Sequence, residues 1–230
     1  TSRYADNASR REFFDTLVSR MSTLPDAESV TGPSIALTGL SMTMPWQIGN
    51  TPRDESPEVG VIDGIGDRHF QTFGIPLVEG RGCAGDADAS AVVISAAMAR
   101  LAFPGQGATG RSLDLSVPSL GTRTVVGVAA DVPDLRTKRP RLPLIYACAG
   151  PERTGSGSIA IRVREGTDPL MVAPILRGAV RSLDPAVPVM GVVVGRRGLV
   201  LEGWARLAGP PAAGGVGVEA GAGTRGVLGL

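Results

Sequence analysis

Two stretches near opposite ends of the chain have the pattern of a helix that is apolar on one side. In residues 8–23 one helical face collects the apolar side chains of residues 13, 14, 17, 18 and 21, and Pro25 follows as a stop signal. Residues 168–183 predict a second helix, in which Asp168 supplies the N-cap and Pro169 occupies the first helical position. Pro174 lies early enough in this helix to be tolerated with some kink.

Strand patterns accompany the two helices. Residues 28–40 predict a β segment broken at Gly32–Pro33, residues 158–165 alternate apolar and polar side chains, and residues 184–194 predict a later strand. Each helix is followed by leucine, proline and an acidic residue and then by a strand, so the two junctions form a weak internal repeat. We therefore expect both ends of the chain to share one α+β layer, with the middle inserted between them.

The middle of the chain predicts mixed β structure with two short helices. The expected elements are a strand from Val59, a helix over 67–73 ending at Gly74, a strand over 91–95, a helix over 96–103 stopped by Pro104–Gly105, and strands over 122–132 and 143–149. The expected division places residues 1–45 and 153–195 in one lobe and residues 46–152 in an inserted lobe. Residues 196–230 become rich in glycine and predict a flexible tail.

The composition supports a globular core and argues against a nucleic-acid-binding protein. Of the 230 residues 43% are hydrophobic, and 23 basic residues nearly balance 22 acidic ones. The sequence has no signal peptide and no run of about 20 apolar residues, so any membrane anchor is expected outside it. The chain opens without methionine and is interpreted as a fragment or a processed form. Cys83 and Cys148 allow either one disulfide or two free thiols, and they match no zinc motif.

Motifs that carry chemistry elsewhere are incomplete in this sequence. His69 is the sole histidine, and no serine lies in a nucleophile elbow, so we expect a partly exposed helix residue without a catalytic role. Residues 105–112 differ from a phosphate loop because they follow a helix and have Arg111 in place of lysine. Gly64 and Gly66 lack the third glycine of a dinucleotide site. Residues 86–90 start like a calcium loop but lack its glycine and glutamate, which predicts an exposed acidic loop.

A basic run lies at residues 136–141. Its four cations predict a solvated loop, and the alternative is a contact to an anion or a lipid headgroup. The cations are Arg136, Lys138, Arg139 and Arg141. The sequence thus indicates no catalytic, cofactor-binding or metal-binding residue, and we expect no cofactor.

An ordered set of short motifs runs through the central stretch. It consists of Asp67–Phe70, Thr72–Leu77, Glu79–Arg81, Ala91–Ile94, Ala97–Arg100, Phe103–Gly105, Gly110–Leu113, Val125–Val128, Asp131–Val132, Arg139–Pro140 and Ile145–Tyr146. In order and spacing, along about residues 4–194, the chain resembles the periplasmic core domain of MacB/FtsX-type ABC-transporter permeases. The macrolide-exporter-like subgroup is the most similar.

The resemblance implies a fold and a function. It implies an α+β domain with a ferredoxin-like (split βαβ), porter-like lobe formed by the N- and C-terminal pieces and an inserted mixed-β, sabre-like lobe. It also implies a place on the extracytoplasmic, periplasmic side of the bacterial membrane, between two membrane helices. Such a domain is non-catalytic and couples helix motion to a substrate or partner outside. The implied partners are a separate cytoplasmic ATPase, a second permease copy and a periplasmic protein.

Three positions depart from the family pattern. Cys83 stands where an aromatic residue is usual, Ser95–Ala96 replaces a common Asn-Glu, and the chain beyond Val194 lacks the expected second membrane helix. A truncated or frame-altered gene would explain the last departure. The alternative function is a stand-alone extracytoplasmic module that binds a ligand or protein between its lobes, and an enzyme ranks last.

Overall fold

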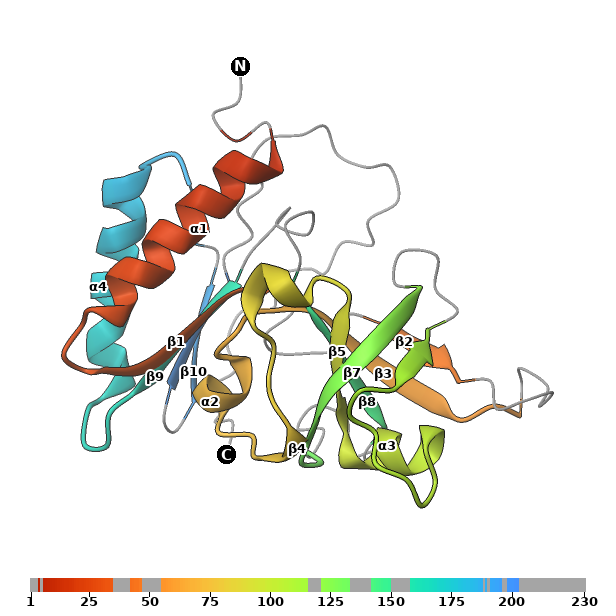
Figure 1. Cartoon of the computed structure of the whole chain (residues 1–230). Helices are drawn as coiled ribbons and strands as arrows, with labels where there is room; N and C mark the ends of the chain where they lie inside the picture. The colour runs from red at the N-terminus through yellow and green to blue at the C-terminus, as the bar shows by residue number, and fades with distance from the viewer. Residues whose placement is uncertain are drawn as a thin grey trace.

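The chain folds around two β-sheets. The computed structural model describes residues 4, 6–34, 42–46, 55–115, 121–132, 142–149, 158–187, 189, 191–195 and 198–202. Within these ranges, one sheet has four strands and the other has seven (Figure 1). The two-lobed α+β class predicted from the sequence is confirmed, because the smaller sheet combines strands from both ends of the chain and the larger one belongs to the middle.

The small lobe is an antiparallel sheet covered on one face by two helices. Its strands run in the order β1 (Ala27–Ser34), β9 (Ser158–Val163), β11 (Gly198–Glu202) and β10 (Gly191–Gly195). Helices α1 (Asn7–Ser22) and α4 (Pro169–Leu183) lie side by side on it (Figure 1). This is a ferredoxin-like arrangement with permuted connectivity, since the strand that would open such a fold, β11, comes last in the chain.

Both helices begin at side-chain caps. Asp6 accepts a hydrogen bond from the backbone N–H of Ser9 at 2.7 Å, and Asp168 accepts one from Leu170 at 2.9 Å. Pro169 fills the first position of α4 as predicted, and the helix continues through Pro174. The inner faces of α1 and α4 pack with β9 into one core: Phe13, Phe14, Leu17, Met21, Val172, Leu176, Val180, Ile159, Ile161 and Val163. This shared core brings the two ends of the chain together.

The large lobe is a mixed sheet. Its strands run in the order β2 (Met42–Pro45), β3 (Glu58–Ile65), β8 (Leu144–Cys148), β5 (Ala91–Ser95), β7 (Thr122–Ala129) and β4 (Leu77–Gly80), and β6 (Ser112–Asp114) pairs with β7. Every residue of the central strands β5 and β8 is buried. Helix α3 (Ala96–Ala102) belongs to one core cluster of this sheet, and helix α2 (His69–Phe73) belongs to another. A 3-10 turn, η1 (Gly85–Asp88), precedes β5.

Three details differ from the sequence predictions. Strand β1 is not broken at Gly32–Pro33 but continues to Ser34, with a register shift after Thr31. Strand β2, expected in the first lobe, pairs with β3, and strand β11, expected in the tail, pairs with β9. Both are short strands whose place is decided by the strand with which they pair rather than by their own pattern. The exact lobe boundaries stay a prediction, and residues 203–230 and the basic run at 136–141 lie outside the described ranges.

The longest described helices have 16 and 15 residues. None of the helices in the described ranges is long and apolar enough to cross a membrane.

Candidate functional site

Helix α2 lies where the two lobes meet (Figure 1). It ends at Gly74, whose left-handed φ of 66° suits glycine. One side of the helix belongs to the large lobe, because the Phe70 ring packs edge-on against Tyr146 with centroids 5.0 Å apart. The other side reaches β1 and β9 of the small lobe. A five-residue helix thus carries much of the contact between the lobes.

The contact from α2 to the small lobe is polar. The hydroxyls of Ser29 and Thr72 are hydrogen-bonded at 2.8 Å, and both residues are buried. Arg162 on β9 donates to the Thr72 carbonyl at 3.3 Å and lies 3.4 Å from the Glu28 carboxylate. A Cβ added at Gly74 would come within 2.7 Å of the Arg162 guanidinium, so this guanidinium fits closely against bare backbone.

A second link between the lobes is an ion pair nearer the surface. Arg11 on α1 lies 2.7 Å from the carboxylate of Asp86 on η1, and it also contacts Asp15 of its own helix at 3.4 Å. The pKa of Arg11 is raised, first by its hydrogen bond to Asp86. The junction therefore combines a buried hydroxyl pair with a partly exposed salt bridge that added salt would weaken.

His69 lies at the same junction, enclosed by aromatic rings. Its ring centroid is 5.3 Å from Phe70, 4.8 Å from Phe73 and 5.8 Å from Tyr146, and the residue is only 3% exposed. Burial lowers its pKa to about 4, so the imidazole is neutral at physiological pH. The sequence prediction of a partly exposed residue is wrong. Two of the rings that bury it, Phe70 and Phe73, belong to its own helix, and the third, Tyr146, comes from the distant strand β8.

Three buried polar atoms near the lobe junction are unpaired among the described residues. They are the Nδ1 of His69, the Thr31 hydroxyl and the Tyr146 hydroxyl. The same burial raises the pKa of Tyr146, with a smaller contribution from Asp131. Asp67, which precedes α2, is exposed and is not brought onto the imidazole. The described structure therefore assembles no Ser-His-Asp arrangement here.

A disulfide and an ion pair hold the segment that follows β4. Cys83 is bonded to Cys148 at the end of β8, with Cα atoms 5.6 Å apart, which decides between the two alternatives left by the sequence. Arg81 binds both carboxylate oxygens of Asp88, which also accepts from the Ala84 N–H at 2.7 Å. Arg81 lowers the pKa of Asp88. Because Asp88 is buried, the exposed acidic loop predicted at residues 86–90 is only partly correct.

Ser95 and Asp131 hold the start of α3. The Ser95 hydroxyl accepts from the backbone N–H of Met98 at 3.2 Å and of Leu144 at 2.9 Å. Asp131 accepts from Ala97 N–H at 2.7 Å and from Arg100 at 2.9 Å. Serine at this departure from the family pattern thus serves as an N-cap that also ties the helix to β8.

The remaining sequence motifs have structural roles. Residues 105–112 follow α3 and lead into β6, as predicted, and Arg111 turns back to donate to the Gly107 carbonyl at 2.8 Å. Gly66, in the incomplete dinucleotide motif, lies against β1, where a Cβ would meet the Thr31 hydroxyl at 3.0 Å. In the described part of the chain, no three His, Cys, Asp or Glu residues are placed to hold a metal ion.

Sequence reasoning missed the residues that join the lobes. Thr72 lies within one of the short motifs and Arg162 within an alternating segment, and the pattern of residues 8–23 does not single out Arg11. A signal was present in β9, where Arg162 is the one charged residue of the strand. Its partner could not be read from the sequence, because 90 residues separate Arg162 from Thr72.

Known proteins resemble this chain in sequence and in fold. The sequence model described as the MacB-like periplasmic core domain matches residues 4–179. The periplasmic region of MacB from Actinobacillus actinomycetemcomitans is a similar solved structure, with 19% identity and a TM-score of 0.50 over 74% of this chain and 73% of that one. The extracellular domain of the transporter YknZ from Gram-positive bacteria has 14% identity and a TM-score of 0.47 over 74% of this chain and 81% of that one. No curated protein sequence matches. The extent of the family match shows that this chain belongs to the family of MacB-like periplasmic core domains.

Proposed function

We propose that this chain is the extracytoplasmic domain of an ABC-transporter permease and transmits movement of membrane helices to a substrate or partner outside the membrane. Its family membership supports this role. The domain would stand on the periplasmic side of the bacterial membrane and catalyse no reaction itself. The ATPase would be a separate cytoplasmic domain or subunit, and a second permease copy and a periplasmic protein are the other expected partners.

The polar junction at α2 is the observation that carries the proposal. The Ser29–Thr72 hydroxyl pair and Arg162 join α2 to the small lobe, while Phe70 fixes the same helix in the large lobe. Polar contacts between lobes can be exchanged for contacts with water at a net cost of only about 1 kcal/mol each. The packed apolar cores on either side resist change far more strongly. Motion would therefore concentrate at this junction.

The Cys83–Cys148 disulfide supports the extracytoplasmic place. Structural disulfides form and persist in oxidising compartments and are rare in the cytosol. The bond connects the segment after β4 to β8 within the large lobe and does not cross the junction. It would stiffen the moving lobe without preventing the movement.

The experiment is to lock the junction. Ser29→Cys and Thr72→Cys are introduced together into the complete permease, with its membrane helices and ATPase, reconstituted in vesicles. The two hydroxyls are 2.8 Å apart, close enough for the replacing thiols to bond with a small adjustment. We expect the locked permease to bind ATP but to lose most of its transport-linked ATP hydrolysis.

The matched control is Ser29→Cys alone, which changes the same buried position without a crosslink. It should keep the hydrolysis rate of the unmodified permease, and peptide mapping should show the native Cys83–Cys148 bond intact in both variants. Full ATP hydrolysis and transport in a permease shown to be crosslinked would refute the proposal. Tight binding of a ligand by the isolated chain, together with activity of the locked permease, would favour the stand-alone binding module.

A further inference from the structure

The outer face of α4 is apolar over its first two turns. Leu170 is 60% exposed, Met171 67% and Ile175 46%, although each could have been a polar residue without disturbing the inner face. Pro174 between them is also exposed, and a Cβ at Gly178, one turn further along, would meet nothing within 4 Å. Single exposed apolar residues are ordinary, but a continuous group of this kind marks an interaction surface.

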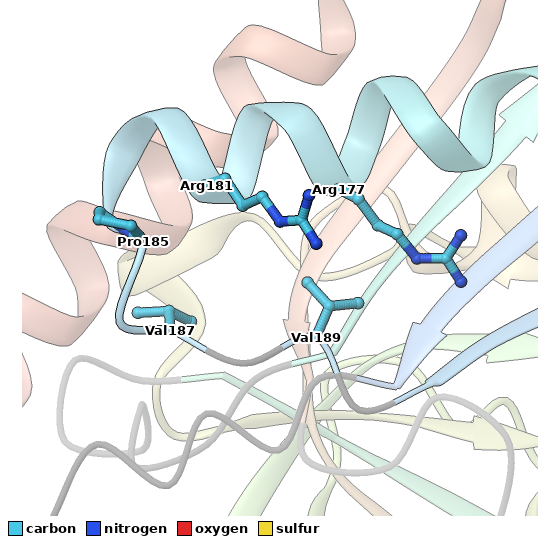
Figure 2. Close-up of a pocket in the computed structure, with 5 residues that line it drawn as sticks. All are labelled: Arg177, Arg181, Pro185, Val187 and Val189. Atoms are coloured by element: carbon cyan, nitrogen blue, oxygen red, sulfur yellow. The ribbon is translucent and has the colours of Figure 1, made fainter.

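The second half of the same helix is cationic. Arg177 and Arg181 are one turn apart, and Figure 2 shows both projecting from α4 on the side of Val187 and Val189. With Pro185, these residues line a cavity of about 320 Å³. Neither guanidinium has an ion-pair or hydrogen-bond partner among the described residues. The nearest acidic residue along the chain is Asp184. It is buried, and its carboxylate accepts a hydrogen bond from the Ala186 backbone N–H at 2.8 Å.

The order of these features along α4 limits what can cover them. The centre of the apolar group and the centre of the arginine pair are about 10 Å apart, at 1.5 Å per residue. A second copy of this chain packed parallel through α4 would place the arginines against each other. An antiparallel copy with the two apolar groups facing would bring the arginines toward the start of the partner's α4, where the Asp168 carboxylate already caps the helix by accepting from the Leu170 N–H at 2.9 Å. A flat bilayer would not fill a concave cavity whose far wall is apolar.

We propose that α4 and its adjoining cavity dock an acidic amphipathic helix of another extracytoplasmic protein. Apolar side chains of that helix would cover Leu170, Met171 and Ile175, and two carboxylates about 10 Å further along would enter the cavity and bind Arg177 and Arg181. This docking proposal rests on the proposed function in one respect, the extracytoplasmic location of the partner. The surface lies on the helical face of the small lobe, away from the α2 junction.

The test uses the full 230-residue chain and a synthetic helical peptide. The peptide carries two turns of leucine and isoleucine followed, about 10 Å along, by two glutamates one turn apart, and a matched peptide carries lysines instead. We expect only the glutamate peptide to bind, with NMR shift changes confined to α4 and residues 185–189. The double variant R177E/R181E should weaken its binding at least about tenfold and should bind the lysine peptide instead.

Two further variants separate the halves of the surface. The M171E/I175E variant should no longer bind the glutamate peptide. Its thermal unfolding temperature should equal that of the parent, since both positions are exposed. Arg68→Glu, an exposed arginine beside α2, is the matched charge control and should leave binding unchanged.

Equal binding of the two peptides, or shift changes elsewhere, would overturn the proposal. So would a dimer in sedimentation that M171E/I175E abolishes, or binding to phosphatidylglycerol vesicles in the absence of peptide binding. None of these outcomes changes the ATP hydrolysis of the junction-locked permease, so failure of the docking surface and failure of the proposed function can be told apart.

Discussion

The buried imidazole of His69 should make the domain less stable in mild acid. In the folded chain its pKa is about 4, because burial among Phe70, Phe73 and Tyr146 disfavours the charged form. In the unfolded chain the pKa returns to about 6.5. Between pH 6.5 and pH 4 the unfolded chain binds a proton at His69 that the folded chain does not bind. The free energy of unfolding therefore falls as the pH falls.

The size of the stability loss follows from the pKa shift of His69. Each unit of difference between the two pKa values is about 1.4 kcal/mol, so the loss contributed by His69 builds up to about 3 kcal/mol between pH 6.5 and pH 4. Below pH 4 this residue adds no further loss, because it is then protonated in both states. A loss of this size is a large part of the total stability of a small domain, which is about 5–15 kcal/mol.

The assay is urea unfolding of the full chain at several pH values between 7.5 and 4, with His69→Phe as the matched variant. Phenylalanine keeps an aromatic ring among the three neighbouring rings and removes the titration. As the pH is lowered, the unfolding free energy of the parent should therefore fall by more than that of the variant. A difference that stays constant over the whole range would refute the reasoning, because carboxylates elsewhere act equally on both proteins.

Three other changes test separate features. Replacing Cys83 and Cys148 by alanine opens a loop with a sequence separation of 65 and should lower the unfolding free energy by about 4 kcal/mol, with no further effect of a reducing agent on the variant. Ser29→Ala leaves the buried Thr72 hydroxyl without its partner and should lower the unfolding free energy by about 1–3 kcal/mol. The double variant with Thr72→Val should lose less than the sum of the two single variants, and additive losses would exclude a coupled pair. Asp168→Ala removes the α4 cap and should lower the unfolding free energy by about 1 kcal/mol, while Asp168→Asn should lower it much less.

Sequence patterns predicted the elements whose cause is local. Helix α4 was predicted because its cap and first-position proline are adjacent in the chain, and β9 because its apolar side chains alternate over six residues. The short strands β2 and β11 escaped prediction, since their pairing depends on β3 and β9. Strand β2 has four residues, too few for its alternation to be recognised, and β11 lies at the start of a glycine-rich stretch.

The junction was beyond prediction for a related reason. Ser29 and Thr72 are 43 residues apart, and each is unremarkable in its own segment. His69 was expected to be partly exposed, but the rings that bury it include Tyr146 from a strand distant in sequence. The Cys83–Cys148 bond had a visible sequence signal in the two cysteines, but composition alone could not choose between a bond and two free thiols.

The permuted ferredoxin-like lobe receives its large insertion between strands that are direct neighbours. Ser34 at the end of β1 is paired with Ser158 at the start of β9, so the chain departs and returns at nearly the same point. Closing a loop becomes only about 0.6 kcal/mol more costly with each doubling of its length, so an insert of this size takes little from the equilibrium stability of its host. Folding speed is affected more, because β1 and β9 find each other quickly only after the insert has compacted and drawn its own ends together. We therefore expect the four-stranded sheet to complete its pairing after the insert has folded.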